Sequence, residues 1–152
     1  MPVSPQDALD GARLTSEERE FWYAWKRAQE AVRTRVLEDV TVATGLSGAD
    51  IGILIRIDDA GGALRQNQLA TSLGWDRTRL SHQLTRMETR ELLARTKVPG
   101  GVEVGMRPAG QTAIETARPI HASAVRNHLI APMGARLPEI QELLEALAAP
   151  RQ

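Results

Sequence analysis

The sequence predicts a mainly α-helical chain with one small β-hairpin. Three observations predict this class. Hydrophobic residues make up 42% of the 152 residues but aromatic residues only 3%, a mix that suits packed helices better than a β-sandwich. Apolar residues recur at three- and four-residue spacing over most of the chain. Only residues 92–107 depart from this spacing, because two β-compatible runs there flank Pro99-Gly100-Gly101, which is a hairpin signal.

The first helix is expected from Thr15 to about Thr41 or Thr44, before Gly45. Thr15 and Glu18 have the spacing of a capping box, in which each side chain satisfies a backbone N–H at the helix start. One face of this helix is apolar and the other is charged, as in an amphipathic helix. The apolar stripe consists of Phe21, Trp22, Trp25, Ala28, Val32, Val36 and Val40.

A second helix is expected to follow, because Ser47 and Asp50 repeat the capping pattern. It ends in the turn at residues 58–62. The apolar residues that we expect to bury its body are Ile51, Leu54, Ile55 and Ile57.

A short third helix is expected over residues 65–73, with Gly74 and Trp75 in the turn after it. Asp76 is a good N-cap for a fourth helix. Two short helices joined by a tight turn form a helix-turn-helix motif. We expect Trp75 to pack beneath the fourth helix.

The periodicity of the fourth helix separates a core face from an outer face. Leu80, Leu84 and Met87 lie at i, i+4 and i+7 and are expected to face the core. The opposite face then carries Thr78, Arg79, Ser81, His82, Thr85, Arg86 and Thr89. Such basic and hydrogen-bonding groups suit contact with base edges and phosphates. The alternative, an ordinary solvated surface, is weaker because a turn and a hairpin flank this helix.

The hairpin of residues 92–98 and 102–107 follows this helix directly, which makes the whole a winged helix-turn-helix. That arrangement lays a helix in the major groove of duplex DNA. Beyond it we expect a helix from Pro108 with a kink at Pro119, since proline lacks the N–H that a helix needs. A last helix is expected over residues 138–148.

The helices at both ends carry more apolar surface than a winged-helix core needs. We therefore expect one domain over residues 1–152, in which residues 46–108 form the DNA-binding core. Residues 13–45 and 109–152 are expected to be dimerisation helices, because a two-fold interface buries the same patch twice.

Positive charge is local in this chain. The formal net charge is +0, yet residues 65–107 hold eight Lys and Arg against four Asp and Glu, a local net charge of +4. Clustered positive charge of this kind is the electrostatic footprint of nucleic-acid binding. The candidate DNA-binding residues are Arg65, Arg77, Thr78, Arg79, Ser81, His82, Arg86, Arg95, Lys97 and Arg107.

Other functional classes find little support. The absence of cysteine excludes disulfides, thiolate metal sites and cysteine-based redox sensing. His121 and His128 are too far apart for a helical metal pair, so we expect core or interface histidines, with no metal and no cofactor. No catalytic triad, phosphate-binding glycine loop or paired carboxylates suggest an enzyme. Without an apolar run of about 20 residues or a signal peptide, we expect a cytoplasmic protein with no membrane partner.

Three stretches of this chain resemble a known protein family. They are Leu64–Glu88, which is the most similar, and residues 117–121 and 125–126. These residues resemble the MarR (multiple antibiotic resistance regulator) family of winged-helix transcription factors, in what looks like an actinobacterial branch. The resemblance extends from the first helix to the last. It implies a homodimeric repressor that binds a pseudo-palindromic operator in double-stranded DNA. It also implies release from DNA when a small aromatic or carboxylate ligand enters a cleft.

The expected wing departs from the family pattern. Family wings carry Asp-x-Arg, whose Arg enters the minor groove, whereas this tip reads Lys97-Val98-Pro99-Gly100-Gly101. Glu91 also replaces the glycine that usually ends the recognition region. We therefore expect a shorter wing that contacts only phosphates, through Arg95, Lys97 or Arg107.

A ligand cleft is expected between the first, second and fifth helices. Its walls would be Trp22, Trp25, Ile51, Ile55 and His121. A mostly apolar lining with one or two polar groups suits a small aromatic acid. Packing in a dimer interface is the alternative for the two tryptophans.

Two functions follow from these observations. The first is sequence-specific regulation of transcription. The alternative is a winged-helix protein-interaction module that has lost operator binding. The altered wing slightly favours the alternative, and the basic face of the fourth helix opposes it.

Overall fold

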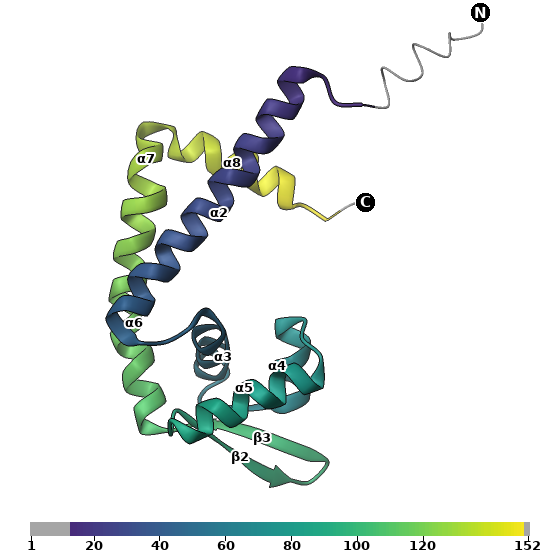
Figure 1. Ribbon diagram of the computed structural model, residues 1–152, viewed down its shortest axis with the longest axis vertical. Coiled ribbons are helices and arrows are strands. Elements are labelled where there is room, and N and C mark those ends of the chain that lie inside the picture. The colour runs from purple at the N-terminus through teal and green to yellow at the C-terminus, as the bar shows by residue number, and fades with distance from the viewer. Residues whose placement is uncertain (1–12, 151–152) are drawn as a thin grey trace, which may run out of the picture.

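The computed structural model describes residues 13–150, and Met1–Ala12 and the last two residues of the expected C-terminal region lie outside the described residues. A long helical arm runs along one side of the molecule, and a smaller lobe that holds the sheet projects from the lower end of this arm (Figure 1). The elements are α2 (Ser16–Thr44), α3 (Gly48–Asp59), β1 (Ala63–Arg65), α4 (Gln66–Leu73), α5 (Arg77–Thr89), β2 (Leu93–Val98), β3 (Gly101–Met106), α6 (Pro108–Val125), a π-helical turn (Arg126–Ile130), α7 (Ala131–Met133), a 3₁₀ turn (Gly134–Arg136) and α8 (Leu137–Ala148).

The helix starts confirm the capping predictions. Thr15 and Glu18 form the reciprocal capping box of α2, with backbone-to-side-chain distances of 2.8 and 3.2 Å. Ser47 and Asp50 do the same for α3. Asp76 caps α5 by accepting the backbone N–H of Arg79 at 2.8 Å. Local sequence therefore sets where these three helices begin.

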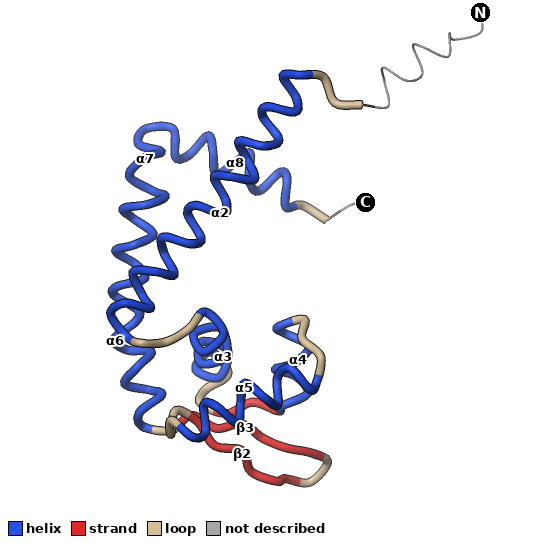
Figure 2. Tube along the Cα trace, viewed as in Figure 1, coloured by secondary structure: helices blue, strands red, loops and turns tan. Residues whose placement is uncertain are grey.

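The sheet has three antiparallel strands in the order β1-β3-β2, and it lies at the bottom of the lobe, beside the start of α6 (Figure 2). The hairpin of β2 and β3 confirms the predicted wing. β1 was not predicted, and it pairs Ala63 with Gly105 and Arg65 with Glu103. Arg65 therefore ends a strand and is the N-cap of α4, whereas the sequence predicted it inside the helix.

The core lies between α3, α4, α5, the sheet and the start of α6. Leu80, Leu84 and Met87 are fully buried there, which confirms the predicted inner face of α5. The other members of this core are Leu46, Ile53, Leu54, Ile57, Leu69, Ala70, Leu92, Leu93, Val104 and Ile114. The lobe thus holds α5 from behind and leaves its outer face free.

The arm is built from α2 and α6, which pack along each other (Figure 1). α6 continues through Pro119, where a kink was expected, and the helical hydrogen-bond pattern changes only at Arg126–Ile130. Among residues 13–150, no single helix is long and apolar enough to span a membrane. α2 and α3 meet that test only as a pair, and a bend of 83° separates them.

Candidate nucleic-acid interface

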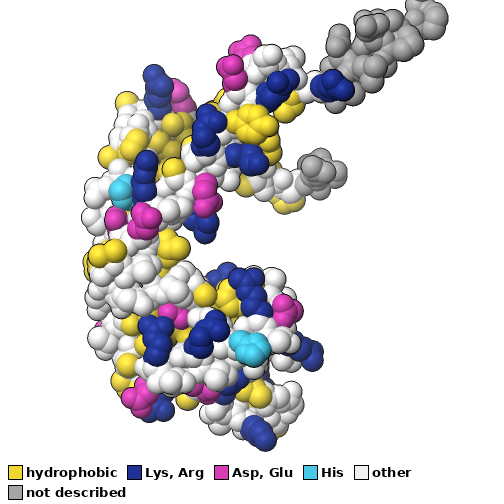
Figure 3. All heavy atoms as spheres, viewed as in Figure 1, with side chains coloured by type: hydrophobic (Ala, Val, Ile, Leu, Met, Phe, Trp, Pro, Cys, Tyr) yellow, Lys and Arg dark blue, Asp and Glu magenta, His cyan; other side chains and the backbone are white. Residues whose placement is uncertain are grey.

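The turn before α5 is a compact left-handed turn. Gly74 has φ of 65°, a conformation that favours glycine, and ends α4. The backbone N–H of Trp75 then donates to the carbonyl of Ala70 at 3.1 Å. Together with the Asp76 cap, these bonds fix the direction in which α5 leaves α4. Lys, Arg and His side chains gather over this lobe in the view of Figure 3.

The outermost ridge of α5 is made of short polar side chains and one histidine. Its members are Thr78, His82, Thr85 and Thr89, and all four are exposed. The hydroxyl of Thr85 donates to the carbonyl of Ser81, and that of Thr89 to the carbonyl of Thr85, each at 3.0 Å. This ridge is low, so a surface as close-fitting as a DNA groove can approach it.

Arg79 lies beside this ridge and is supported from below. Its guanidinium carbon is 4.0 Å from the centre of the Trp75 ring, a cation–π contact. Trp75 is half-buried against the core, which confirms that it packs under α5. The tryptophan therefore joins Arg79 to the rigid part of the lobe.

Arg86 lies two turns further along α5 and is linked to a buried polar network. Its guanidinium donates to Oε1 of Gln83. Nε2 of Gln83 donates to Oδ1 of Asp50 at 2.7 Å, and Nη1 of Arg90 donates to Oδ2 of the same carboxylate at 2.7 Å. Sequence reasoning missed this network, although a glutamine among Leu80, Leu84 and Met87 was a signal that it existed.

Asp50 is ionised in this setting. Burial raises the pKa of its carboxyl, but the backbone N–H of Ser47 and the Arg90 guanidinium outweigh that effect and lower the pKa below its ordinary value. The carboxylate is only 2% exposed. A charged group that deep is stable because donors surround it.

Arg95 of the wing is bound to α5 rather than free. Its guanidinium contacts Oε2 of Glu88 at 2.6 Å, Thr85 Oγ1 at 2.9 Å and Ser81 Oγ at 3.2 Å. The hydrogen bond from Arg95 lowers the pKa of Glu88. The structure thus gives Arg95 and Ser81 a place in the contact between wing and helix, where the sequence suggested direct phosphate and DNA contacts.

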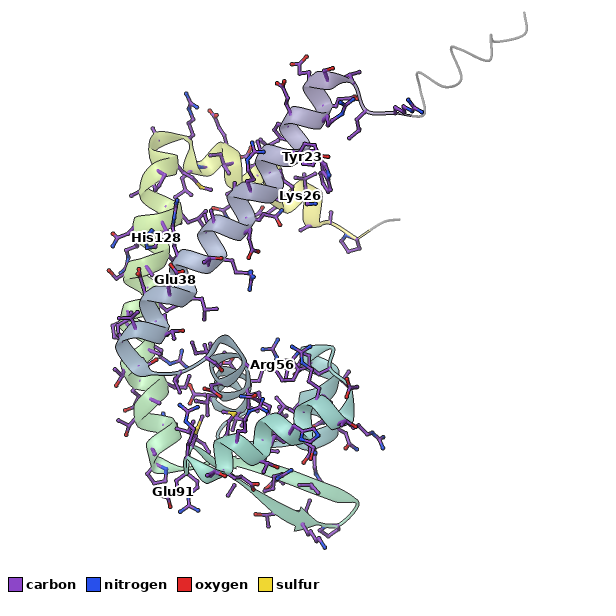
Figure 4. The ribbon with its side chains drawn as sticks, in the orientation of Figure 1. Tyr23, Lys26, Glu38, Arg56, Glu91 and His128 are labelled. Carbon is purple, nitrogen blue, oxygen red and sulfur yellow. The ribbon has the colours of Figure 1, made fainter. Side chains whose placement is uncertain are left out.

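The other candidate cations in and near the wing differ in whether another residue holds their side chains. Arg65 donates to the carbonyl of Pro99 at 3.0 Å and so ties the hairpin tip to the start of α4. Lys97 is exposed on β2. Arg107 lies 3.9 Å from Glu91 in an exposed ion pair at the base of the hairpin, where Figure 4 labels Glu91. Glu91 has φ of 57°, which explains why the family pattern prefers glycine there.

A second candidate site is a cleft of about 620 Å³ between α2, α3 and α6. It contains three of the five residues predicted to line it: Ile51, Ile55 and His121. Its other lining residues are Arg33, Val36, Leu37, Val40, Gly48, Gly52, Ile114, Ala117 and Arg118.

Trp22 and Trp25, which were also predicted to line the cleft, are not among its lining residues in the single chain. Arg33 is the first cleft residue on α2, and Trp25 precedes it by eight residues, about 12 Å along a helix axis. Trp22 lies further out and is 49% exposed.

The two histidines of the arm lie in different surroundings, and neither is buried in the core. Nε2 of His128 lies 2.8 Å from Oδ2 of Asp39, which joins the π-helical turn to α2 (Figure 4). His121 is exposed at the cleft. Within residues 13–150 no three His, Asp or Glu side chains lie close enough to hold a metal ion.

Most of the chain superposes on solved regulators of transcription. AbsC, a MarR family transcriptional regulator from Streptomyces coelicolor, matches 90% of this chain and 95% of its own, with a TM-score of 0.78 and 27% identity. The chain has the MarR-family fold. This fold is a winged helix-turn-helix with flanking helices, which is the order of elements that the sequence predicted.

Two further MarR-type structures were solved with a bound molecule. Sco3205, from Streptomyces coelicolor and in complex with DNA, matches 92% of this chain and 93% of its own, with a TM-score of 0.74 and 22% identity. The repressor CouR, bound to p-coumaroyl-CoA, matches 91% of this chain and 100% of its own, with a TM-score of 0.69 and 25% identity. No protein-family model and no curated protein sequence matches this chain.

Proposed function

We propose that this MarR-type protein is a DNA-binding regulator of transcription that acts in the cytoplasm and lays α5 in the major groove. The observation that carries the proposal is the outer face of α5, where Arg79 and Arg86 flank a low polar ridge and are both held by groups of the lobe. A DNA complex of a protein with the same fold supports it.

The proposed contacts divide into two groups. Thr78, Arg79, His82 and Arg86 face outward on α5 and would read base edges. The flanking cations Arg65, Arg77, Lys97 and Arg107 would contact phosphates and fix the register of the protein on the duplex. Ser81 and Arg95 would support this surface by locking the wing to α5.

Arg79→Ala and Arg86→Ala are each expected to weaken operator binding by about 1–3 kcal/mol if the guanidinium reads a base, with relaxed specificity at that base. If the arginine contacts only phosphate, binding should weaken on every sequence and the salt slope should fall by about 1. Fluorescence anisotropy over a salt series measures both. Asp59→Ala, an exposed change at the end of α3 outside the proposed contacts and dimerisation helices, is the control and should bind as wild type. Unchanged affinity in both α5 variants would contradict the assignment.

We propose that the protein is a homodimer on a pseudo-palindromic operator, with residues 13–45 and 109–152 as its dimerisation helices. Large apolar side chains remain exposed on α2 and α8, among them Phe21 at 74% and Leu147 at 77%. Exposed apolar area of this extent marks an interaction surface. The partner proposed for this surface is a second copy of the chain. In a two-fold dimer the apolar residues near both ends of one chain would be buried against the same residues of the other.

Sedimentation equilibrium at micromolar concentration is expected to give twice the chain mass of 16.7 kDa. Replacing both Leu143 and Leu147 with Glu should shift the protein to monomer, because two charges would have to be buried in the interface. Circular dichroism checks that the variant stays helical. A folded wild-type monomer would contradict the dimer.

We further propose repression that a small aromatic carboxylate relieves by entering the cleft. Ile51 and Ile55 supply apolar wall, while Arg33, Arg118 and His121 supply polar groups at its edge. CouR, of the same fold, was solved with an aromatic thioester bound. Isothermal titration calorimetry measures the binding of aromatic carboxylates. A carboxylate that binds should also raise the operator dissociation constant, and Arg118→Ala should weaken the binding of that carboxylate. Binding with no effect on DNA affinity would leave the cleft as packing space.

A further inference from the structure

Gln83 is a buried polar residue on the inner face of α5. Its side chain is 6% exposed, and its neighbours on that face are Leu80, Leu84 and Met87. A buried amide costs free energy unless its donor and acceptor find partners. Both find them, since the amide N–H donates to Asp50 and the amide oxygen accepts from Arg86.

The chemistry of Asp50 decides which way this amide points. An ionised carboxylate only accepts hydrogen bonds, so the amide nitrogen of Gln83 has to face it. The amide oxygen is thereby turned toward Arg86. Asp50 is itself fixed, because the backbone N–H of Ser47 donates to Oδ2 at 2.9 Å and Arg90 donates to the same atom at 2.7 Å. The acceptor that Arg86 meets is therefore rigid.

Arg86 keeps most of its guanidinium available for other partners. The side chain is exposed, and a guanidinium has five N–H donors. It lies seven residues from Arg79 on the same flank of α5, about 10.5 Å along the helix axis. A long side chain that is already ordered loses less conformational entropy when it binds.

We propose that Gln83 is a positioning residue that holds Arg86 in its DNA-binding orientation, with Asp50 setting the direction of the Gln83 amide. This proposal rests on the proposed function. It assigns a role in DNA recognition to a side chain that cannot touch DNA. It also makes the first turn of α3, which carries Asp50, part of the DNA-binding apparatus.

A double-mutant cycle of Gln83→Leu and Arg86→Ala tests the role on DNA. Leucine fills a similar volume without the amide, and Gln83→Met serves where the leucine variant does not fold. Gln83→Leu is expected to weaken binding to the operator by about 2- to 10-fold, the effect of ordering one side chain. In the Arg86→Ala background the same change is expected to have no further effect. Equal losses in both backgrounds would overturn the proposal, because Gln83 would then act without Arg86.

Side-chain NMR of the free protein provides a readout that general stability does not move. The Nε–H group of Arg86 is expected to be ordered in the wild type and mobile in Gln83→Leu, with exposed Arg77 as the mobile reference. An Arg86 group equally ordered in both proteins would overturn the proposal. If the wild type binds no duplex, the proposed function fails, and the NMR comparison alone decides whether Gln83 orders Arg86.

Discussion

Gly110→Ala is expected to unfold or severely destabilise the protein, by about 3 kcal/mol or more, at the upper end of the cost of overpacking. Gly110 is buried near the start of α6, against the sheet. A Cβ there would lie 2.0 Å from the carbonyl oxygen of Leu92 and 2.8 Å from the sulfur of Met106. The first of these is backbone, which cannot rotate away, so α6 would have to leave the sheet.

Urea unfolding followed by circular dichroism measures this loss. Gly105→Ala is the matched control, because a Cβ at Gly105 meets nothing within 4 Å. Its unfolding midpoint should lie close to that of the wild type. A Gly110→Ala protein with the wild-type midpoint would show that α6 does not pack this closely.

Asp50→Ala is expected to lower the free energy of unfolding by about 2–4 kcal/mol. The change removes one half of the capping box of α3, the hydrogen bond from the backbone N–H of Ser47 to the Asp50 carboxylate, which contributes about 1 kcal/mol. It also leaves the buried amide of Gln83 without an acceptor, at about 1–3 kcal/mol. Thermal and urea unfolding measure the sum, and Asp59→Ala on the exposed end of α3 is the control.

The same carboxylate predicts a pH dependence. Its pKa in the folded protein lies below the ordinary value of 3.8, so the unfolded chain binds the proton more readily. The stabilisation by Asp50 is therefore complete above about pH 5 and is lost as the pH falls through the lower folded pKa. Glu88 has a lowered pKa as well and contributes in a similar range. The wild type should consequently lose more stability than Asp50→Asn between about pH 5 and 2, and parallel curves would contradict this assignment.

Local signals in the sequence predicted most of the fold. Capping residues such as Thr15 and Asp76 and the spacing of Leu80, Leu84 and Met87 report on neighbours in the chain, and helix boundaries followed from them. β1 was missed because three residues carry no periodicity. Its strand character comes from pairing with β3, about 40 residues later.

The candidate site was predicted less completely because its geometry depends on contacts between distant residues. The outer face of α5 follows from periodicity alone. That Arg95 lies on Glu88 rather than free at the wing depends on how β2 packs against α5. Likewise, the link from Asp50 to Gln83 joins residues 33 positions apart. Trp22 and Trp25 were placed in the cleft by helix face, whereas distance along α2 keeps them out of it.

The outer face of α5 is expected to recognise a specific DNA sequence. Fluorescence anisotropy of the wild-type protein, at one fixed salt concentration, should compare duplexes that flank its own gene with shuffled duplexes of the same composition. One flanking duplex is expected to bind at least about 1,000-fold more tightly than its shuffled version. Equal affinity for all duplexes, or no binding by a folded protein, would contradict the claim and favour a winged-helix protein-interaction module.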